Sequence, residues 1–342
     1  MTITIRCDVG EEIGLGHYYR CAFLKKVFEK NGINVCLALK CLDENVCNLP
    51  YDLLIDTSYS EEIEKYNFKN RHLILDIYHS KNHQNQELFN YLFDLKKYNN
   101  MLAFIGGLEN DACPYAYYSY IDVLITPYIN INNHSTEKHP VHFAGKDFLI
   151  LDETKVLKRK HINKVANKIL ITFGGSDPWK QSIATLKILD KDKRSEDLEI
   201  TVVIGPLMQQ EQIKMIETSV YSFKKINLQY SPENLKESFK WADLAITNTG
   251  QTRYELAASG VPFIICPFNK EGYYMSKIFE KLEAAYLDPY CQDSLGIGCV
   301  DVLFDLLKNY DKRVYMSMNG KNYFYLPKSA DNLVKNLIKV WL

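Results

Sequence analysis

The sequence predicts an α/β protein built from two Rossmann-like domains, each with a parallel β-sheet. Short, continuously apolar runs alternate along the chain with stretches of helical period. Strands that are apolar throughout are typical of parallel sheets covered by helices on both faces. With 342 residues, the chain has about the length of two such domains. Ligands of open sheets of this kind lie beyond the carboxyl ends of the strands, so we expect the two sheets to face a central cleft.

The apolar runs form two series, and the clearest helix lies near the start of the first. Cys21, Leu24 and Phe28 share one face of residues 18–30, and Gly32 follows where a glycine often ends a helix. The first series predicts strands at residues 2–6, 35–39, 52–55, 72–75, 102–105 and 123–126. The second series predicts strands at residues 169–173, 199–204, 226–230, 244–247 and 263–266.

A polar and weakly patterned stretch, residues 130–160, separates the two series, and we place the domain boundary within it. The first domain is expected to span residues 1–145 and the second residues 146–330. A last helical stretch, residues 331–342, is expected to pack back on the first domain.

Composition excludes several classes of protein. Lys and Arg number 41 and Asp and Glu 42, so no overall charge draws the chain to nucleic acid or to an anionic membrane. Nine cysteines are scattered without a CxxC pair, which is typical of reduced thiols in a cytoplasmic protein. The N-terminus does not read as a signal peptide, and no run approaches the roughly 18–20 apolar residues of an integral membrane segment.

Two glycines precede a histidine in IGLGHYYRC, residues 13–21, just after the first predicted strand. Gly14 and Gly16 allow a sharp turn and close approach to a ligand, and the helix that follows directs its free N–H groups to the same place. His17 would then point toward a ligand rather than into the core. A plain strand-to-helix turn with an ordinary first-turn histidine explains the stretch equally well.

A second glycine turn follows a predicted strand in ITFGGSDPWK, residues 171–180. Here Ser176 or Asp177 is expected to cap the next helix, with Pro178 in its first turn. That simple turn explains the capping residues well and the paired glycines, Gly174 and Gly175, less well.

A third predicted strand leads into a helix whose start carries hydroxyls, a glycine and free N–H groups. These groups together can form a phosphate cradle without a metal. Glu255, on the first turn of that helix, could accept hydrogen bonds from two ribose hydroxyls. Compensation of the helix dipole is the alternative explanation of this glutamate. The cradle residues are Asn248, Thr249, Gly250, Gln251 and Thr252.

Metal-ligating patterns are weak in this chain. Asp190 and Asp192 flank a lysine within a charged run at a predicted helix end, which favours a solvated loop. His79 and His83 are four residues apart but have no acidic or cysteine partner at metal-like spacing. We therefore expect neither a metal nor a cofactor.

The three glycine-bearing motifs together resemble the PseG-like UDP-sugar hydrolases of pseudaminic acid biosynthesis. The motifs read R-x-D-x(4)-I-G-x-G-H-x-x-R-C from Arg6, F-G-G-S-D-P from Phe173, and G-x-T-x-x-E from Gly250. This family is related to the peptidoglycan N-acetylglucosaminyltransferase within the GT-B group. The resemblance implies a GT-B fold, UDP bound by the second domain, and metal-independent cleavage of a UDP-linked deoxyamino sugar at the anomeric carbon.

The resemblance implies a role for each matched position. His17 would be the catalytic base on the first domain, where the sugar or an acceptor lies. The substrate-binding residues would be Asp8, Gly14, Gly16 and Arg20 on the first domain, and Gly174, Gly175, Asn248, Thr249, Gly250, Gln251, Thr252 and Glu255 on the second.

The chain departs from the hydrolase pattern where the sugar would lie. It has Asp56-Thr57-Ser58-Tyr59 in place of Asp-His-Tyr, Asp76-Ile77 in place of paired acids, and PFNKEGYY without an Asn-Gln pair. Residues 79–120 also form a segment that is longer than the one expected in these hydrolases. Two alternatives therefore remain: a GT-B glycosyltransferase that moves a sugar to a glycan acceptor, and a non-catalytic nucleotide-sugar-binding protein.

Overall fold

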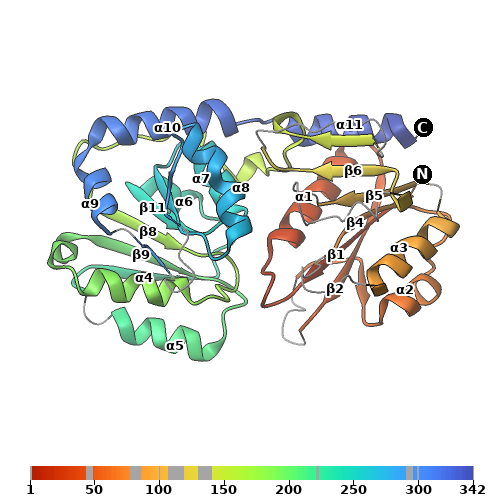
Figure 1. Ribbon diagram of the computed structural model, residues 1–342, viewed down its shortest axis with the longest axis horizontal. Coiled ribbons are helices and arrows are strands. Elements are labelled where there is room, and N and C mark those ends of the chain that lie inside the picture. The colour runs from red at the N-terminus through yellow and green to blue at the C-terminus, as the bar shows by residue number, and fades with distance from the viewer. Residues whose placement is uncertain are drawn as a thin grey trace. The chain divides into compact units, whose positions relative to one another are not determined.

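The structure, a computed structural model, forms two compact units (Figure 1). Unit 1 comprises Met1–Leu151 with Leu326–Leu342, and unit 2 comprises Asp152–Tyr325. The boundary thus falls a few residues beyond the expected 145/146. Leu149 is buried, and its carbonyl accepts a hydrogen bond of 2.7 Å from the hydroxyl of Ser329 in the same unit. The described residues are 2–43, 49–77, 86–99, 101–106, 119–129, 141–220, 223–289, 296–298 and 300–341.

Unit 1 contains a parallel sheet of seven strands in the order β3-β2-β1-β4-β5-β6-β7. For example, Ile5 of the central strand pairs with Leu37 on one side and with Ile74 on the other. A neighbouring strand therefore covers each edge of the central strand. The strands are β1 Thr2–Val9, β2 Asn34–Cys41, β3 Leu53–Ile55, β4 His72–Asp76, β5 Met101–Ile105, β6 Val123–Thr126 and β7 Val141–Ala144. The sequence pattern missed β7, an edge strand whose first two residues are exposed.

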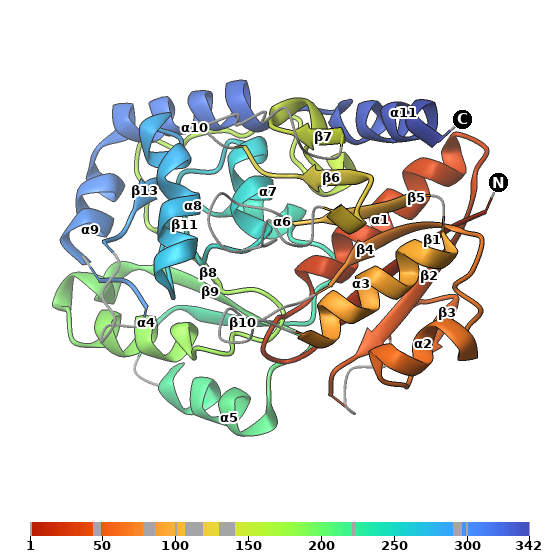
Figure 2. The ribbon, with the colours of Figure 1, turned by 45° about the vertical axis from the view of Figure 1, so that its right-hand side comes forward.

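Four α-helices are described around this sheet: α1 Gly16–Lys30, α2 Tyr59–Lys65, α3 Gln86–Tyr98 and α11 Ser329–Trp341. A 3-10 turn, η3, covers Lys146–Phe148. Helices α2 and α3 lie side by side on one face of the sheet and α1 on the other (Figure 2). The C-terminal helix α11 packs against α1, where Trp341 stacks on Phe28 with ring centroids 6.1 Å apart.

Unit 2 contains a parallel sheet of six strands in the order β10-β9-β8-β11-β12-β13. Its strands are β8 Lys168–Thr172, β9 Glu199–Ile204, β10 Ile226–Tyr230, β11 Leu244–Thr247, β12 Phe263–Ile265 and β13 Tyr286–Leu287. The two residues of β13 are too few to give a recognisable pattern. The helices are α4 Gln181–Asp190, α5 Gln210–Ser219, α6 Lys236–Trp241, α7 Thr252–Ser259, α8 Lys270–Lys281, α9 Val300–Lys308 and α10 Tyr310–Phe324, with 3-10 turns η4 Glu153–Lys155 and η5 Lys193–Asp197.

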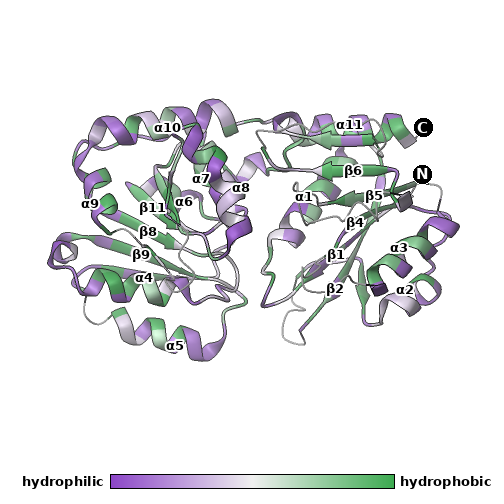
Figure 3. Ribbon diagram, viewed as in Figure 1, coloured by the Kyte–Doolittle hydropathy of each residue, from purple (hydrophilic) through white to green (hydrophobic). Residues whose placement is uncertain are grey.

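Both sheets are apolar along their strands, while the helices carry hydrophilic residues on their outer faces (Figure 3). Two parallel sheets with helical crossovers were the predicted fold class, and the structure confirms it. In each unit the strand order reverses once, between β1 and β4 and between β8 and β11. The carboxyl edges of the sheets at these two points are where ligands of such folds bind.

Two local expectations were wrong. Strand β1 continues to Val9, so Asp8 lies within the strand and not in the turn after it. Helix α4 begins at Gln181, after Lys180 in the left-handed conformation, so Pro178 precedes the helix. The Asp177 carboxylate accepts hydrogen bonds of 2.8 Å from the N–H groups of Gln181 and Ser182. The turn is therefore longer than the sequence indicated.

Gly205 is predicted to be essential for the packing of unit 2. A Cβ added there would lie 2.5 Å from the carbonyl oxygen of Gly174 and would also collide with that of Gly175. Gly205→Ala is therefore expected to lower the free energy of unfolding by about 1–3 kcal/mol or more. Gly16→Ala is the matched control, because a Cβ at this helical position meets nothing within 4 Å. Denaturant unfolding of both variants tests this, and equal stabilities would contradict it.

Candidate functional site

The turn between β1 and α1 places His17 at the carboxyl edge of the first sheet. Gly14 has a φ of 71°, which favours glycine, and its N–H donates to the Gly10 carbonyl at 2.8 Å. Helix α1 begins at Gly16, and no side chain caps its first N–H groups. The His17 side chain is the second of the helix and remains 22% exposed.

Asp76 orients the imidazole of His17. The Nδ1 atom of His17 lies 2.6 Å from Oδ1 of Asp76, the last residue of β4. Because β4 is the strand on the other side of the reversal, the sheet order brings together two residues that are distant in sequence. An ionised carboxylate only accepts hydrogen bonds, so a hydrogen bond between these two atoms requires a proton on Nδ1; in the neutral imidazole the lone pair is then on Nε2. Nε2 is then free to accept a proton from a ligand or water.

Arg20 neutralises the buried Asp76. Its guanidinium donates to both oxygens of Asp76, at 2.5 Å between Nη2 and Oδ1, and Nη1 donates to the Tyr128 hydroxyl at 2.6 Å. Burial by itself would raise the pKa of Asp76, but Arg20 and His17 outweigh it and hold that pKa well below its usual range. The guanidinium of Arg20, expected to bind substrate, is thus directed at Asp76 and Tyr128.

Asp8, also expected to bind substrate, belongs to a buried charge cluster. Arg6 donates to Asp8 and, at 3.0 Å and 3.2 Å, to Glu62 on α2. Tyr91 and Lys40 also donate to Glu62, at 2.8 Å and 2.9 Å. Burial by itself would raise the pKa of Glu62, but Arg6 and then Lys40 lower it. Contact between Asp8 and substrate stays a prediction.

Asn248 joins two loops at the carboxyl edge of the second sheet. Its Nδ2 donates to the Phe173 carbonyl at 2.8 Å, where β8 has just ended. Its Oδ1 accepts from the N–H of Gly250 at 2.9 Å. Gly174 has a φ of 88°, a conformation that favours glycine. The paired glycines thus turn the chain beside residues 248–252, which we call the β11–α7 loop.

Three polar side chains at the start of α7 are available to a ligand. Thr249 in the β11–α7 loop, and Thr252 and Glu255 on the first turn, make no side-chain hydrogen bond or ion pair within the described part of the chain. Burial raises the pKa of Glu255, with Lys155 opposing the shift. No side chain caps α7. A phosphate would find N–H groups there, and a hydroxyl-bearing ligand would find an acceptor in Glu255.

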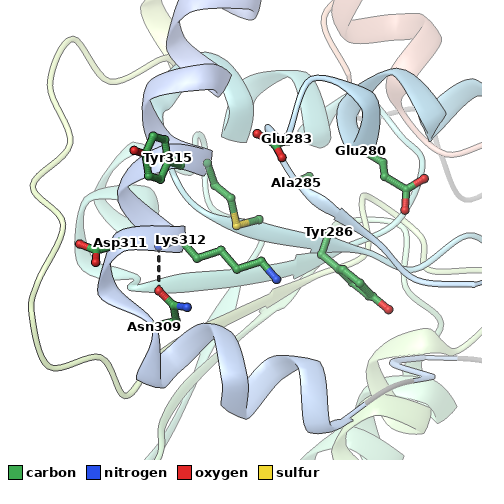
Figure 4. Close-up of a pocket in the computed structure, with 9 residues that line it drawn as sticks. Glu280, Glu283, Ala285, Tyr286, Asn309, Asp311, Lys312 and Tyr315 are labelled. Atoms are coloured by element: carbon green, nitrogen blue, oxygen red, sulfur yellow. Dashed lines mark hydrogen bonds between the residues drawn. The ribbon is translucent and has the colours of Figure 1, made fainter.

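Unit 2 also has a cavity of about 490 Å³, which lies between the end of α8, β13 and the start of α10 (Figure 4). Tyr286, Met316 and Lys312 line it, and the Asn309 side chain accepts from the Lys312 N–H at 2.9 Å. It contains none of the residues that the sequence singled out.

Among the described residues, no three His, Cys, Asp or Glu side chains form a metal-binding group. Asp192 is paired with Arg194 at 2.6 Å at the start of η5, which gives this aspartate a structural role. His79 and His83 lie outside the described residues. None of the described helices is long and apolar enough to cross a membrane.

Comparison with known proteins finds a similarity to a family of domains in the second unit and to two curated proteins over most of the chain. Residues 169–295 match the glycosyltransferase family 28 C-terminal domain. The uncharacterized protein MJ1062 of Methanocaldococcus jannaschii is 27% identical over 309 residues, 84% of this chain and 60% of that protein. The pseudaminic acid cytidylyltransferase and UDP-2,4-diacetamido-2,4,6-trideoxy-beta-L-altropyranose hydrolase of Helicobacter pylori is 27% identical over 82% of this chain and 47% of that protein. The chain therefore spans about half the length of these relatives.

Solved structures share the whole fold at low sequence identity. MurG of Acinetobacter baumannii aligns with a TM-score of 0.59 and 14% identity, over 99% of this chain and 100% of that one. UDP-GlcNAc 2-epimerase of Neisseria meningitidis, bound to UDP-GlcNAc, aligns with a TM-score of 0.62 and 11% identity, over 99% and 100%. The two Rossmann-like units therefore have the GT-B fold, whose structural neighbours include enzymes of UDP-sugars.

Asp76→Asn is predicted to destabilise the protein, because it leaves the buried guanidinium of Arg20 without its charged partner. Removing one member of a buried pair typically costs about 3–5 kcal/mol. The free energy of unfolding at pH 7, compared between the wild type and the variant, tests this expectation. Arg20→Met in the Asp76→Asn background removes the orphaned charge and is expected to recover part of this loss. Additive losses in the double variant would contradict a direct pairing.

The same pair predicts a pH dependence. The folded-state pKa of Asp76 is lowered, so the pair contributes its full stability above the usual Asp pKa of about 3.9. The stability advantage over Asp76→Asn should therefore shrink as the pH falls below about 4.

Proposed function

We propose that this protein hydrolyses a UDP-linked deoxyamino sugar at the anomeric carbon, without a metal, in the biosynthesis of a nonulosonic acid of the pseudaminic type or of a surface glycan. The observation that carries the proposal is the His17–Asp76 pair, in which a buried carboxylate holds a partly exposed imidazole. A histidine oriented in this way is suited to general-base catalysis. The similarity to the Helicobacter pylori hydrolase supports the reaction class.

Each residue has a role in the proposed reaction. Nε2 of His17 takes a proton from water as the water oxygen bonds to the anomeric carbon, while the bond from that carbon to the β-phosphate oxygen breaks with its electrons. The ionised Asp76 stabilises the imidazolium that forms. The N–H groups at the start of α7 stabilise the charge on the departing UDP. The imidazolium then returns its proton to solvent.

The second unit is proposed to bind UDP. Gly174 and Gly175 allow close approach of the diphosphate, and the β11–α7 loop receives it through backbone N–H groups and the hydroxyls of Thr249 and Thr252. Glu255 accepts hydrogen bonds from the ribose. The availability of these side chains and the match to the family 28 C-terminal domain support this assignment.

Glycosyl transfer is the second candidate, and the match to the family 28 C-terminal domain favours it. An acceptor hydroxyl would replace water, with the same base. Incubation with a panel of UDP-sugars, with and without a glycan acceptor, separates the two. Free sugar and UDP formed without acceptor support hydrolysis, while UDP release that requires acceptor supports transfer. Binding without any release of UDP would leave the non-catalytic nucleotide-sugar-binding protein.

His17→Ala is predicted to lower turnover by about 10²–10⁴-fold and to leave UDP affinity nearly unchanged, since only the base is removed. Release of UDP measures turnover, and calorimetry measures affinity. His161→Ala, at an exposed histidine in unit 2, is the control and should behave as the wild type. Near-normal activity of His17→Ala would show that His17 is only a turn residue.

Glu255→Ala is predicted to weaken UDP binding by about 1.5–3 kcal/mol, the usual cost of losing hydrogen bonds to a carboxylate. Glu255→Gln retains one acceptor oxygen and should lose less. Calorimetry gives both affinities, and thermal unfolding gives the stabilities. If UDP affinity is unchanged while stability falls, the glutamate serves only the helix dipole.

Activity is predicted to survive exhaustive chelation with EDTA, because N–H groups at a helix start can take the place of a metal at the diphosphate. Turnover is assayed after chelation and after Mg²⁺ or Mn²⁺ is added back separately. Complete loss on chelation, restored by one of these ions, would refute the metal-free mechanism.

A further inference from the structure

Trp179 and Phe268 form an aromatic pair at the carboxyl edge of the second sheet. Trp179 lies in the turn between β8 and α4, and Phe268 lies in the loop between β12 and α8. Their ring centroids are 5.8 Å apart and their planes differ by 18°, so the rings are stacked. The Trp179 side chain nevertheless remains 46% exposed. A large apolar ring that is held by a neighbour and still open on one side is suited to contact with a ligand.

Three contacts hold this pair beside the β11–α7 loop. Gln181, two residues after Trp179, donates from Nε2 to the Cys266 carbonyl at 3.0 Å. Asn248 joins the loops after β8 and β11. Gly272, on the first turn of α8, packs so closely on Thr249 that an added Cβ would lie 2.5 Å from its Oγ1. Since β11 lies between β8 and β12 in the sheet, the stacked pair spans the end of the strand that leads to Thr249.

The topology decides which end of a nucleotide sugar meets the pair. From the reversal point, the chain runs from β8 to β9 in one direction and from β11 to β12 in the other. Right-handed crossovers therefore place α4 and α7 on opposite faces of the sheet, as Figures 1 and 2 show. Trp179 leads into α4, and Glu255 lies on α7. If the diphosphate lies at the start of α7 and the ribose at Glu255, as proposed above, the sugar extends away from the ribose toward the opposite face, where the turn that carries Trp179 leads into α4.

We propose that Trp179 and Phe268 form a platform on which the sugar of the nucleotide sugar stacks; this rests on the proposed function. The C–H face of a pyranose and the methyl of an N-acetyl group are apolar, so they gain by covering the exposed indole. The neighbouring amide is already engaged, because Oδ1 of Asn269 accepts from the Gly272 N–H at 2.7 Å and caps α8. Stacking on Trp179 and Phe268 thus recognises the sugar at a place where the Asn269 side chain already caps α8.

The test compares UDP with UDP-N-acetylglucosamine and UDP-N-acetylgalactosamine by calorimetry. Trp179→Ala is expected to weaken binding of at least one UDP-sugar by about 3- to 10-fold while UDP affinity stays unchanged. Trp179→Phe, which keeps a ring, should retain most of the affinity. Tyr315→Ala is the control, since this tyrosine is 62% exposed on α10 and lines the separate cavity.

Fluorescence gives an independent readout, because the chain has three tryptophans and Trp179 is the most exposed of them. Its emission should change with a UDP-sugar more than with UDP, and Trp179→Phe should lose that difference. Equal losses of UDP and UDP-sugar affinity in Trp179→Ala, or no Trp179-dependent effect with either sugar, would overturn the platform while UDP binding stands. A wild-type protein that binds none of the three ligands would instead overturn the proposed function, and the platform with it.

Discussion

The candidate site of the first unit depends on the buried carboxylate of Asp76. It lies at the end of β4, is fully buried, and receives hydrogen bonds from His17, Arg20 and the Cys21 thiol. A carboxylate in such a place is costly unless a cation faces it, and Arg20 supplies that cation. With the charge stabilised, the imidazole is held in one tautomer with Nε2 available. Arg20 thus acts on the proposed reaction through Asp76, as a positioning residue.

In the second unit, the candidate site consists of backbone groups and neutral side chains together with one acid, Glu255. Asn248 joins the loops after β8 and β11, and Gly205 lets the chain after β9 pass against Gly174 and Gly175. The start of α7 provides N–H groups, while Glu255 is the only acidic residue in its first turn. This arrangement suits an anion even though the whole chain has a net charge of −1, because helix termini act over short distances.

The structure shows which contacts are made by two of the residues that depart from the hydrolase pattern. Asp76, which stands where the family tends to have paired acids, is the partner of His17. Asn269, which stands near the expected Asn-Gln pair, caps α8. The proposed stacking of a sugar on Trp179 and Phe268 would account for sugar recognition without that pair. Hydrolysis and transfer share all of these features, so the nature of the nucleophile separates them.

The sequence by itself determined the two parallel sheets, most strand positions and the three glycine turns, because these depend on local apolar runs and on φ angles that favour glycine. It also pointed to His17 and Glu255 as side chains at helix starts. Only the tertiary structure decided that Arg20 meets Asp76, that Asp8 joins Arg6 and Glu62, and that Trp179 stacks on Phe268. Those contacts follow from strand order and crossover handedness, which bring together residues far apart in the chain, and no local pattern records them.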